Sequence, residues 1–397
     1  MFDFRSRQMI EALRSGVPSR IVGEYFSEAR PAMMKKISDK LDRVRDEHIS
    51  DGFLFTGRYG EGKTHLLNTV LSMASSSQMV VSFVSLGKET PMEKPWVLYK
   101  KMIANTYLPG ARQPGFFHKF EALPPGGSVI GEMLAYSAKE LETDKLYYLL
   151  RAYYGTQDEE EKYIFLSDLA GNFCNLAQVK KGYKAATGQT AKFNQNFSKT
   201  KHAMDYFHFM SHLFRQMGYK GWVLLFDEAE LLGRLGKKTR LKSYQAMDLF
   251  LEPSQKLESV FSLFAMSSSY VEEVIDKKHE FANLEEMFSD DQAASNVLNM
   301  ILKAPELVPL TKDEIRQILM QIQDFHGRAY DWHPDVSVDT LYKATEAGGY
   351  LLRTKIRAAI EFLDQLYQYG EAGETRINEL GAESYMEDET PSLDALL

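Results

Sequence analysis

The chain has 397 residues, of which 44% are hydrophobic, and its 55 acidic and 47 basic side chains give a formal net charge of −8. This balance is typical of a soluble globular protein and argues against one whose whole surface binds nucleic acid. The single cysteine, Cys174, excludes an internal disulfide and a multi-thiolate metal site, which suits a reducing cytosol. There is no run of about 18 apolar residues and no basic-then-apolar start, so the sequence predicts a cytoplasmic protein without a membrane span.

Residues 1–50 are expected to form two helices that pack on a nucleotide site farther along the chain. Apolar residues recur at helical spacing over 10–17 and again over 33–44. The turn between the two stretches contains Val17 and Ile21, which with Pro18 and Val22 are candidates for a pocket around the base of a nucleotide. The alternative, that these side chains pack only against the core, stays open.

A glycine-rich loop follows the expected strand 52–56 and precedes an expected helix. Residues 57–64 read G-x-x-x-x-G-K-T, whose glycines let successive backbone N–H groups face inward as an anion nest for phosphates. The helix dipole adds positive potential, Lys63 would contact the β- and γ-phosphates, and the Thr64 hydroxyl would ligate Mg²⁺. A chance match in a glycine turn is the alternative. The candidate ATP-binding residues are Gly57, Tyr59, Gly60, Glu61, Gly62, Lys63, Thr64 and His65.

Two adjacent acids end the apolar run 222–227. A run without polar alternation is typical of a buried parallel strand, and ligand groups lie at the carboxyl ends of such strands. Asp227 is therefore expected to reach Mg²⁺, directly or through water, and Glu228 to polarise the attacking water as general base. The alternative is an ordinary strand that ends in a solvated acidic turn.

Further strands are expected at 79–86, 260–266 and, shorter, 306–310. Strands that alternate with helices predict an α/β fold, an αβα sandwich around a five-stranded parallel sheet. The long, mostly helical stretch between the second and third strands is expected to be an insertion, because a single crossover needs far fewer residues. The expected parts are N-terminal helices (1–50), an ATPase core (51–89 and 220–310), a helical insertion (90–219), a C-terminal helical lid (311–380) and a disordered acidic tail (381–397).

The lid is expected to begin at Thr311, which with Glu314 three residues later has the pattern of a capping box. Its helices are expected at 312–326, 337–346 and 353–369.

A basic stretch within the insertion is a candidate for nucleic-acid binding. Its lysines could neutralise phosphates, and the aromatic residues among them, Tyr183, Phe193 and Phe197, could stack on bases. The alternative is a flexible, soluble loop whose aromatic residues anchor it to the core. The lysines are Lys180, Lys181, Lys184, Lys192, Lys199 and Lys201.

Several segments resemble a known family. The phosphate loop and acid pair are similar to those of additional-strand P-loop ATPases of the AAA+ class. Residues 13–20 (LRSGVPSR), 218–230 (GYKGWVLLFDEAE) and 353–357 (RTKIR) resemble the bacterial ATP-binding proteins of the BrxD type, which are encoded in BREX phage-defence clusters. The resemblance covers roughly residues 7–367. It implies ATP binding, a cytoplasmic location and action with other proteins of a defence island.

The same resemblance implies further site residues. Enzymes of this class place a polar side chain at the end of the fourth strand, where Ser267 and Ser268 stand, and a lid arginine near the γ-phosphate, for which Arg353 is the candidate. Arg353 opens a helix, where a cation opposes the dipole, so an anionic partner is expected. For an arginine finger, Arg234 and Arg240 stay open candidates.

Three functions follow from these residues. The first is a Mg²⁺-dependent ATPase that remodels DNA or partner proteins in a defence complex, as a homo- or hetero-oligomer. The second is a nucleotide-dependent scaffold with little turnover, and the third is a signalling ATPase that oligomerises on a foreign ligand. Glu228 favours the first, because a pure switch has little use for a water-activating base. A small-molecule kinase is a weaker alternative without a specific acceptor site.

Overall fold

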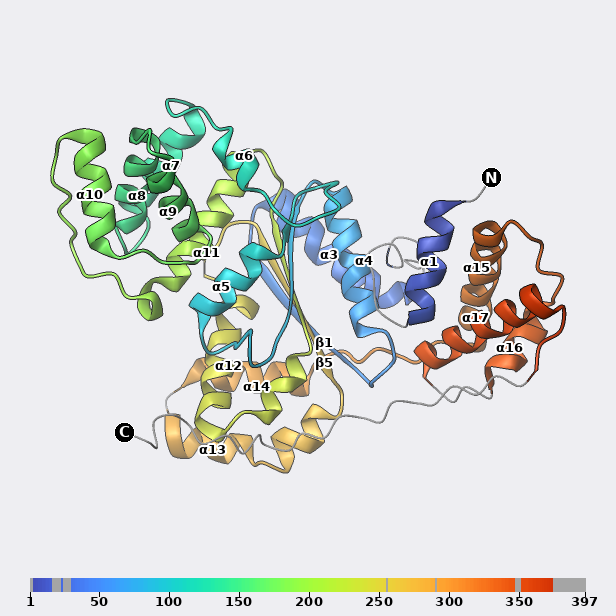
Figure 1. Ribbon diagram of the computed structural model, residues 1–397. Helices are drawn as coiled ribbons and strands as arrows, with labels where there is room; N and C mark the ends of the chain where they lie inside the picture. The colour runs from blue at the N-terminus through green and yellow to red at the C-terminus, as the bar shows by residue number, and fades with distance from the viewer. Residues whose placement is uncertain are drawn as a thin grey trace, which may run out of the picture.

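The computed structural model describes residues 3–15, 23, 30–254, 256–289, 291–346 and 351–373. In these ranges a five-stranded sheet has the order β1-β5-β4-β2-β3, with helices on both faces (Figure 1). All neighbouring strands run parallel except β3, which is antiparallel to β2. The strands are β1 (Asp51–Gly57), β2 (Val80–Ser85), β3 (Thr106–Tyr107), β4 (Trp222–Asp227) and β5 (Val260–Ser267).

The helices fall into groups along the chain. Two precede the sheet and one follows the glycine loop: α1 (Phe4–Ser15), α3 (Pro31–Glu47) and α4 (Lys63–Ser76). The next group lies between β2 and β4: α5 (Pro95–Ala104), α6 (Phe117–Glu121), α7 (Ser128–Lys139), α8 (Lys145–Gly155), α9 (Glu159–Leu169), α10 (Leu176–Thr187) and α11 (Lys199–Gln216). The last are η1 (Ala229–Arg234), α12 (Lys237–Leu251), η2 (Val271–Asp276), α13 (Glu280–Phe288), α14 (Gln292–Leu302), α15 (Lys312–Tyr330), α16 (Val338–Glu346) and α17 (Leu352–Tyr369).

The two faces of the sheet are covered by different helices. Helices α3 and α4 cover one face with side chains such as Ile37 and Val70, which pack with Phe55 and Leu225 of the strands. Helices α5, α11 and α12 lie on the other face, in a cluster that includes Phe226 of β4. Every residue of β4 and β5 is buried, which explains why both strands read as unbroken apolar runs.

The prediction of a strand at 306–310 is wrong. Next to β1 the chain forms only an isolated bridge, in which Glu306 pairs with Thr56. The Leu307 N–H donates to the Thr56 carbonyl (2.7 Å), but Pro309 has no N–H with which to continue a ladder. The fifth strand is instead β3, only two residues long, so the sheet is mostly rather than wholly parallel.

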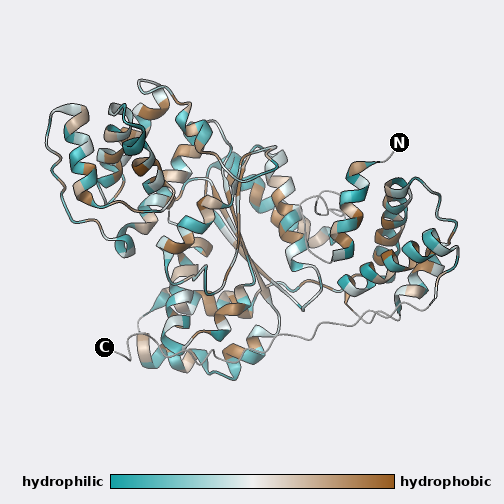
Figure 2. Ribbon diagram, in the orientation of Figure 1, coloured by the Kyte–Doolittle hydropathy of each residue, from teal (hydrophilic) through white to brown (hydrophobic). Residues whose placement is uncertain are grey.

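The insertion helices share one hydrophobic cluster with the face of the sheet that they cover. In Figure 1, α7–α10 lie beyond α11, on the side of the sheet away from α3 and α4, and α6 lies above α11. Figure 2 shows hydrophobic and hydrophilic residues on the same peripheral helices, as expected where each helix buries one side. No helix in the described ranges is both long and apolar enough to span a bilayer.

Helix α1 packs on the C-terminal helices, although both N-terminal helices were expected beside the nucleotide site. Its residues Met9, Ile10 and Leu13 belong to a cluster formed with α15, α16 and α17. The Arg14 guanidinium donates to the Asp364 carboxylate of α17 (2.7 Å). Helix α1 is therefore part of the C-terminal helical body, and of the described N-terminal helices α1 and α3 only α3 covers the sheet.

Candidate functional site

The glycine loop joins β1 to α4 and contains two glycines with a left-handed backbone. Gly60 (φ 77°) and Gly62 (φ 92°) lie in the left-handed region, and Gly62 is the N-cap of α4. The loop is braced by the Glu61 carboxylate, which accepts the Arg58 N–H at 2.9 Å. A side chain at Gly60 would meet Leu351 at 3.0 Å. Both the backbone angles and this contact therefore favour glycine at position 60.

Lys63 begins α4 with its ammonium held inside the loop. Its side chain is buried, and Nζ donates to the Gly57 carbonyl at the start of the loop (3.1 Å). The nearest carboxylate is that of Glu230, 3.6 Å away, beyond hydrogen-bond distance. The ammonium is thus desolvated beside a neutral carbonyl and a loosely placed acid, an arrangement that suits an incoming anion.

The acid at the end of β4 meets the first turn of α4. Asp227 is 3% exposed, its carboxylate accepts the Glu228 N–H at 2.9 Å, and the Thr64 hydroxyl lies close enough to lower its pKa. Burial raises the pKa of Asp227, and the Thr64 hydroxyl, the Glu228 N–H and the nearby Lys63 ammonium offset part of that rise. A hydroxyl and a carboxylate are ligands of a hard cation, so the two residues predicted for Mg²⁺ lie together.

Glu228 differs from its neighbour in exposure and backbone. Its side chain is exposed, and its backbone is left-handed (φ 57°), which is uncommon for a residue with a side chain. This turn starts η1 and sends the chain back toward the loop. The glutamate predicted as general base therefore lies at the open side of the site.

Glu230, which was not predicted from the sequence, is brought into the site by the turn at Glu228. One oxygen of its carboxylate lies 3.6 Å from Lys63 Nζ, and the other accepts the Ser267 N–H at 3.0 Å. Burial raises the pKa of Glu230, whereas Lys63 lowers it. The only sequence signal was its place three residues after Asp227, which has no meaning until the conformation of the intervening turn is known.

The serines at the end of β5 lie next to the start of the loop. Ser267 pairs with Gly57 in the parallel register, and the Ser268 N–H donates to the Gly57 carbonyl (3.2 Å). The Ser267 hydroxyl shares a hydrogen bond with that of Ser269 (2.9 Å). Because β5 lies between β1 and β4, these serines stand between the loop and the acids.

The C-terminal helices reach the loop through the start of α17. The Arg353 guanidinium lies 6.0 Å from the centre of the Tyr59 ring, and its charge helps to lower the pKa of Asp227. The candidate base-pocket residues Val17 and Ile21 lie outside the described residues.

Two groups of predicted residues lie elsewhere. Arg240 is 1% exposed, and its guanidinium donates twice to the buried Glu280 carboxylate (2.8 Å each), so it is a core residue rather than an arginine finger. In the basic stretch, Lys181 and Lys201 have acidic neighbours at 3.5 and 3.7 Å, and the aromatic residues pack into the insertion. All six lysines of this stretch are exposed, on α10, on α11 and in the segment between them.

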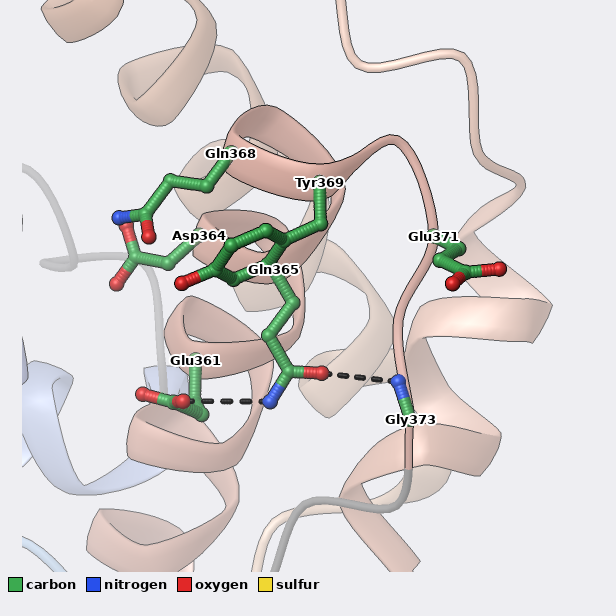
Figure 3. A pocket seen from close by; sticks show the side chains of 7 residues that line it. All are labelled: Glu361, Asp364, Gln365, Gln368, Tyr369, Glu371 and Gly373. Carbon is green, nitrogen blue, oxygen red and sulfur yellow. Dashed lines mark hydrogen bonds between the residues drawn. The ribbon is translucent and has the colours of Figure 1, made fainter.

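A pocket at the other end of α17 is separate from the loop. In Figure 3 the Gln365 side chain bridges Glu361 and the backbone N–H of Gly373. Arg353 precedes this end of the helix by at least eight residues, which is roughly 12 Å of helix. The lining residues are Glu361, Asp364, Gln365, Gln368, Tyr369, Glu371 and Gly373.

The sheet is mostly parallel, a glycine loop follows its first strand, and a buried acid lies at the carboxyl end of β4. These three features are consistent with a P-loop nucleotide-binding protein. A model of the family described as BREX system ATP-binding protein BrxC/D matches residues 3–118 and 129–379. The chain therefore belongs to this family, as the sequence motifs predicted. Searches against curated proteins and against solved structures found no match.

Proposed function

We propose that this member of the BREX ATP-binding family binds ATP with Mg²⁺ in the glycine loop and hydrolyses it, as an AAA+-like ATPase. The observation that carries the proposal is the closeness of the Thr64 hydroxyl to the Asp227 carboxylate, whose pKa it lowers, although the two residues are far apart in the sequence. It brings a hydroxyl and a carboxylate together beside the Lys63 ammonium. These are the groups that a magnesium-bound triphosphate requires.

Each residue has a distinct role in this proposal. The N–H groups of the loop and the Lys63 ammonium bind phosphate oxygens, while Thr64 and Asp227 hold the cation. Bound Mg²⁺ would neutralise charge on the phosphate oxygens. Glu228 accepts a proton from water at the open side of the site, and Ser267 and Ser268 help to orient that water. Arg353 adds a positive charge from the C-terminal helices.

The second candidate function is a nucleotide-dependent scaffold or signalling switch with little turnover. It is favoured by the burial of Arg240, which leaves Arg234 as the one arginine-finger candidate named from the sequence. Without such a finger, transition-state stabilisation would be weaker by a factor of about 10³–10⁵. In either case the partners are other proteins of the defence system, and oligomers of the chain or DNA at the basic stretch of the insertion are further candidates.

Two measurements test the proposal. Calorimetry with ATP, with and without Mg²⁺, should detect binding that depends on Lys63. Steady-state phosphate release should then exceed that of Glu228→Gln, with or without DNA and partner proteins. Binding together with equal release from both proteins under every condition would leave the scaffold. No heat from ATP with folded protein would overturn nucleotide binding itself.

A further inference from the structure

Arg30 links the glycine loop to the C-terminal helices. It precedes α3 with a left-handed backbone (φ 59°), and its carbonyl accepts the N–H groups of Met33 and Met34 at 3.1 Å each. Its guanidinium donates to two backbone carbonyls, that of Glu61 in the loop (2.6 Å) and that of Val308 before α15 (3.2 Å). One rigid, planar side chain thus fixes two segments that are far apart in the sequence.

The bond to Glu61 determines how the loop presents its next N–H group. In a planar trans peptide the carbonyl and the following N–H point in opposite directions. With the Glu61 carbonyl turned toward Arg30, the Gly62 N–H must point away from Arg30. A charged donor on the carbonyl also polarises the peptide and makes that N–H a better donor to an anion. Arg30 therefore orients one of the donors of the anion nest without facing the nest itself.

The same residue holds the start of α15. The Glu314 carboxylate accepts the Thr311 N–H (2.8 Å) and the Thr311 hydroxyl (2.8 Å), and the backbone N–H of Arg30 lies close enough to lower its pKa. These bonds lower the pKa of Glu314. Arg30 thus contacts the capping box of α15 with its backbone and the loop with its side chain. A change in the Glu61–Gly62 peptide is carried to α15 through one residue.

We propose that Arg30 is a positioning residue that couples occupancy of the glycine loop to the first turns of α15. An anion on the Gly62 N–H strengthens the opposite bond, between Arg30 and the Glu61 carbonyl. That bond holds Arg30, and with it the Val308 carbonyl that leads into α15, in place beside the Glu314 carboxylate. The C-terminal helices then become less mobile when nucleotide binds. This inference rests on the proposed nucleotide binding and adds to it a route from the loop to α15.

Hydrogen–deuterium exchange with and without Mg²⁺ and ATP tests the coupling. In the unaltered protein, ATP should slow exchange both in residues 57–66 and in residues 311–318. In Arg30→Lys and Arg30→Ala, ATP should still slow exchange in the loop, with affinity lower by no more than about tenfold, the effect of one or two hydrogen bonds. The slowing over 311–318 should be lost. Arg30→Lys keeps the charge but not the two-pronged guanidinium, so it separates positioning from net charge.

Arg43→Ala is the matched control, because Arg43 lies on the same helix in an exposed ion pair with Glu47 (3.6 Å). It should behave as the unaltered protein. If Arg30→Ala does not fold, Arg30→Lys carries the test. ATP-dependent slowing over 311–318 that survives in a folded Arg30 variant would overturn the coupling and leave nucleotide binding intact. If the unaltered protein binds no ATP, the proposed function and the coupling fail together.

Discussion

Two buried lysines in this chain have opposite surroundings. Lys145 of α8 is fully buried with Asp168, to which its ammonium donates, and it also donates to the Tyr206 hydroxyl (3.2 Å). The Phe197 ring lies over it, with the ring centre 4.1 Å from Nζ. Lys63, at the start of α4, has the Gly57 carbonyl at 3.1 Å and the Glu230 carboxylate only at 3.6 Å.

The difference separates a structural charge from a charge that suits a ligand. Asp168 also accepts the Tyr206 hydroxyl (2.6 Å) and the Cys174 N–H (2.7 Å), so that network is closed on itself. Around Lys63 the nearest acid is too far away for a hydrogen bond, while the glycine loop curls around the ammonium. A buried charge is costly unless it is well paired, so a loosely paired one indicates a site that another group completes.

The largest expected effect is a loss of stability when the closed network around Lys145 and Asp168 is broken. Lys145→Met should lower the free energy of unfolding by about 3–5 kcal/mol, because it leaves the Asp168 carboxylate buried without its counter-charge. Urea denaturation measures the loss, and calorimetry should find ATP affinity retained wherever the variant is folded. The double variant Lys145→Met, Asp168→Leu should recover part of the stability, since it removes the orphaned charge. No recovery would mean that the Tyr206 and Cys174 bonds matter more than the ion pair.

The same substitution at Lys63 should lower ATP affinity rather than stability. Lys63→Met keeps the length of the side chain but removes the ammonium, so ATP affinity should fall at least about 30-fold, the loss of a desolvated charge contact. The free energy of unfolding should change by less than about 1 kcal/mol, because a charge that lacks a close partner stabilises little. The two Lys→Met variants are controls for each other. A large loss of stability in Lys63→Met would show that the pair with Glu230 is structural.

Elements defined by local pattern were predictable from the sequence. The strands β1, β4 and β5 were found because burial on both faces leaves an apolar run, and the glycine loop because its backbone angles require glycine. The capping box of α15 was visible in Thr311 and Glu314, and both of its bonds are present. Such features depend on neighbouring residues and on general sterics, which a sequence carries directly.

The missed features depend on contacts that no local pattern encodes. Glu230 enters the site because the backbone of Glu228 is left-handed. The backbone of Arg30, whose side chain reaches the loop, is left-handed as well. Non-glycine residues rarely adopt this conformation, so nothing in the sequence signals it. The packing of α1 on the C-terminal helices likewise joins segments more than 300 residues apart, as in the contact between Arg14 and Asp364. Pro309, by contrast, is a local feature that argues against the expected strand, because proline has no N–H to donate to a ladder.

Asp227 extends the comparison between the Lys145 and Lys63 surroundings to the pH dependence of the free energy of unfolding. Burial raises the pKa of Asp227 in the native state. At pH 7 the ionised carboxylate is therefore less favourable in the native state than in the unfolded state, which lowers the free energy of unfolding. Asp227→Asn should therefore increase the free energy of unfolding at pH 7 by about 0.5–2 kcal/mol, the range of typical stabilising substitutions. As pH falls through the raised native pKa, the unaltered protein gains stability, and the advantage of Asn disappears below the unfolded value.

Urea denaturation from pH 7 to pH 3 measures this dependence. The exposed Asp39, which pairs with Lys35 at 3.1 Å on α3, is the matched control. Asp39→Asn should change stability by less than about 0.5 kcal/mol at every pH. If Asp227→Asn is less stable than the unaltered protein at pH 7, the Glu228 hydrogen bond and the contact with Thr64 outweigh burial, and the acid belongs with Asp168 as a structural group.

The smallest expected effect tests whether Glu230 competes with phosphate for Lys63. Glu230→Gln removes a negative charge 3.6 Å from the ammonium but keeps an oxygen that can accept the Ser267 N–H. ATP affinity should rise by about two- to tenfold, since a partly shielded unit charge at this distance contributes on the order of 1 kcal/mol. Glu228→Gln is the same substitution at an exposed carboxylate and should leave affinity within about twofold. Weaker ATP binding by Glu230→Gln would show that this carboxylate holds Lys63 in place rather than opposing the ligand.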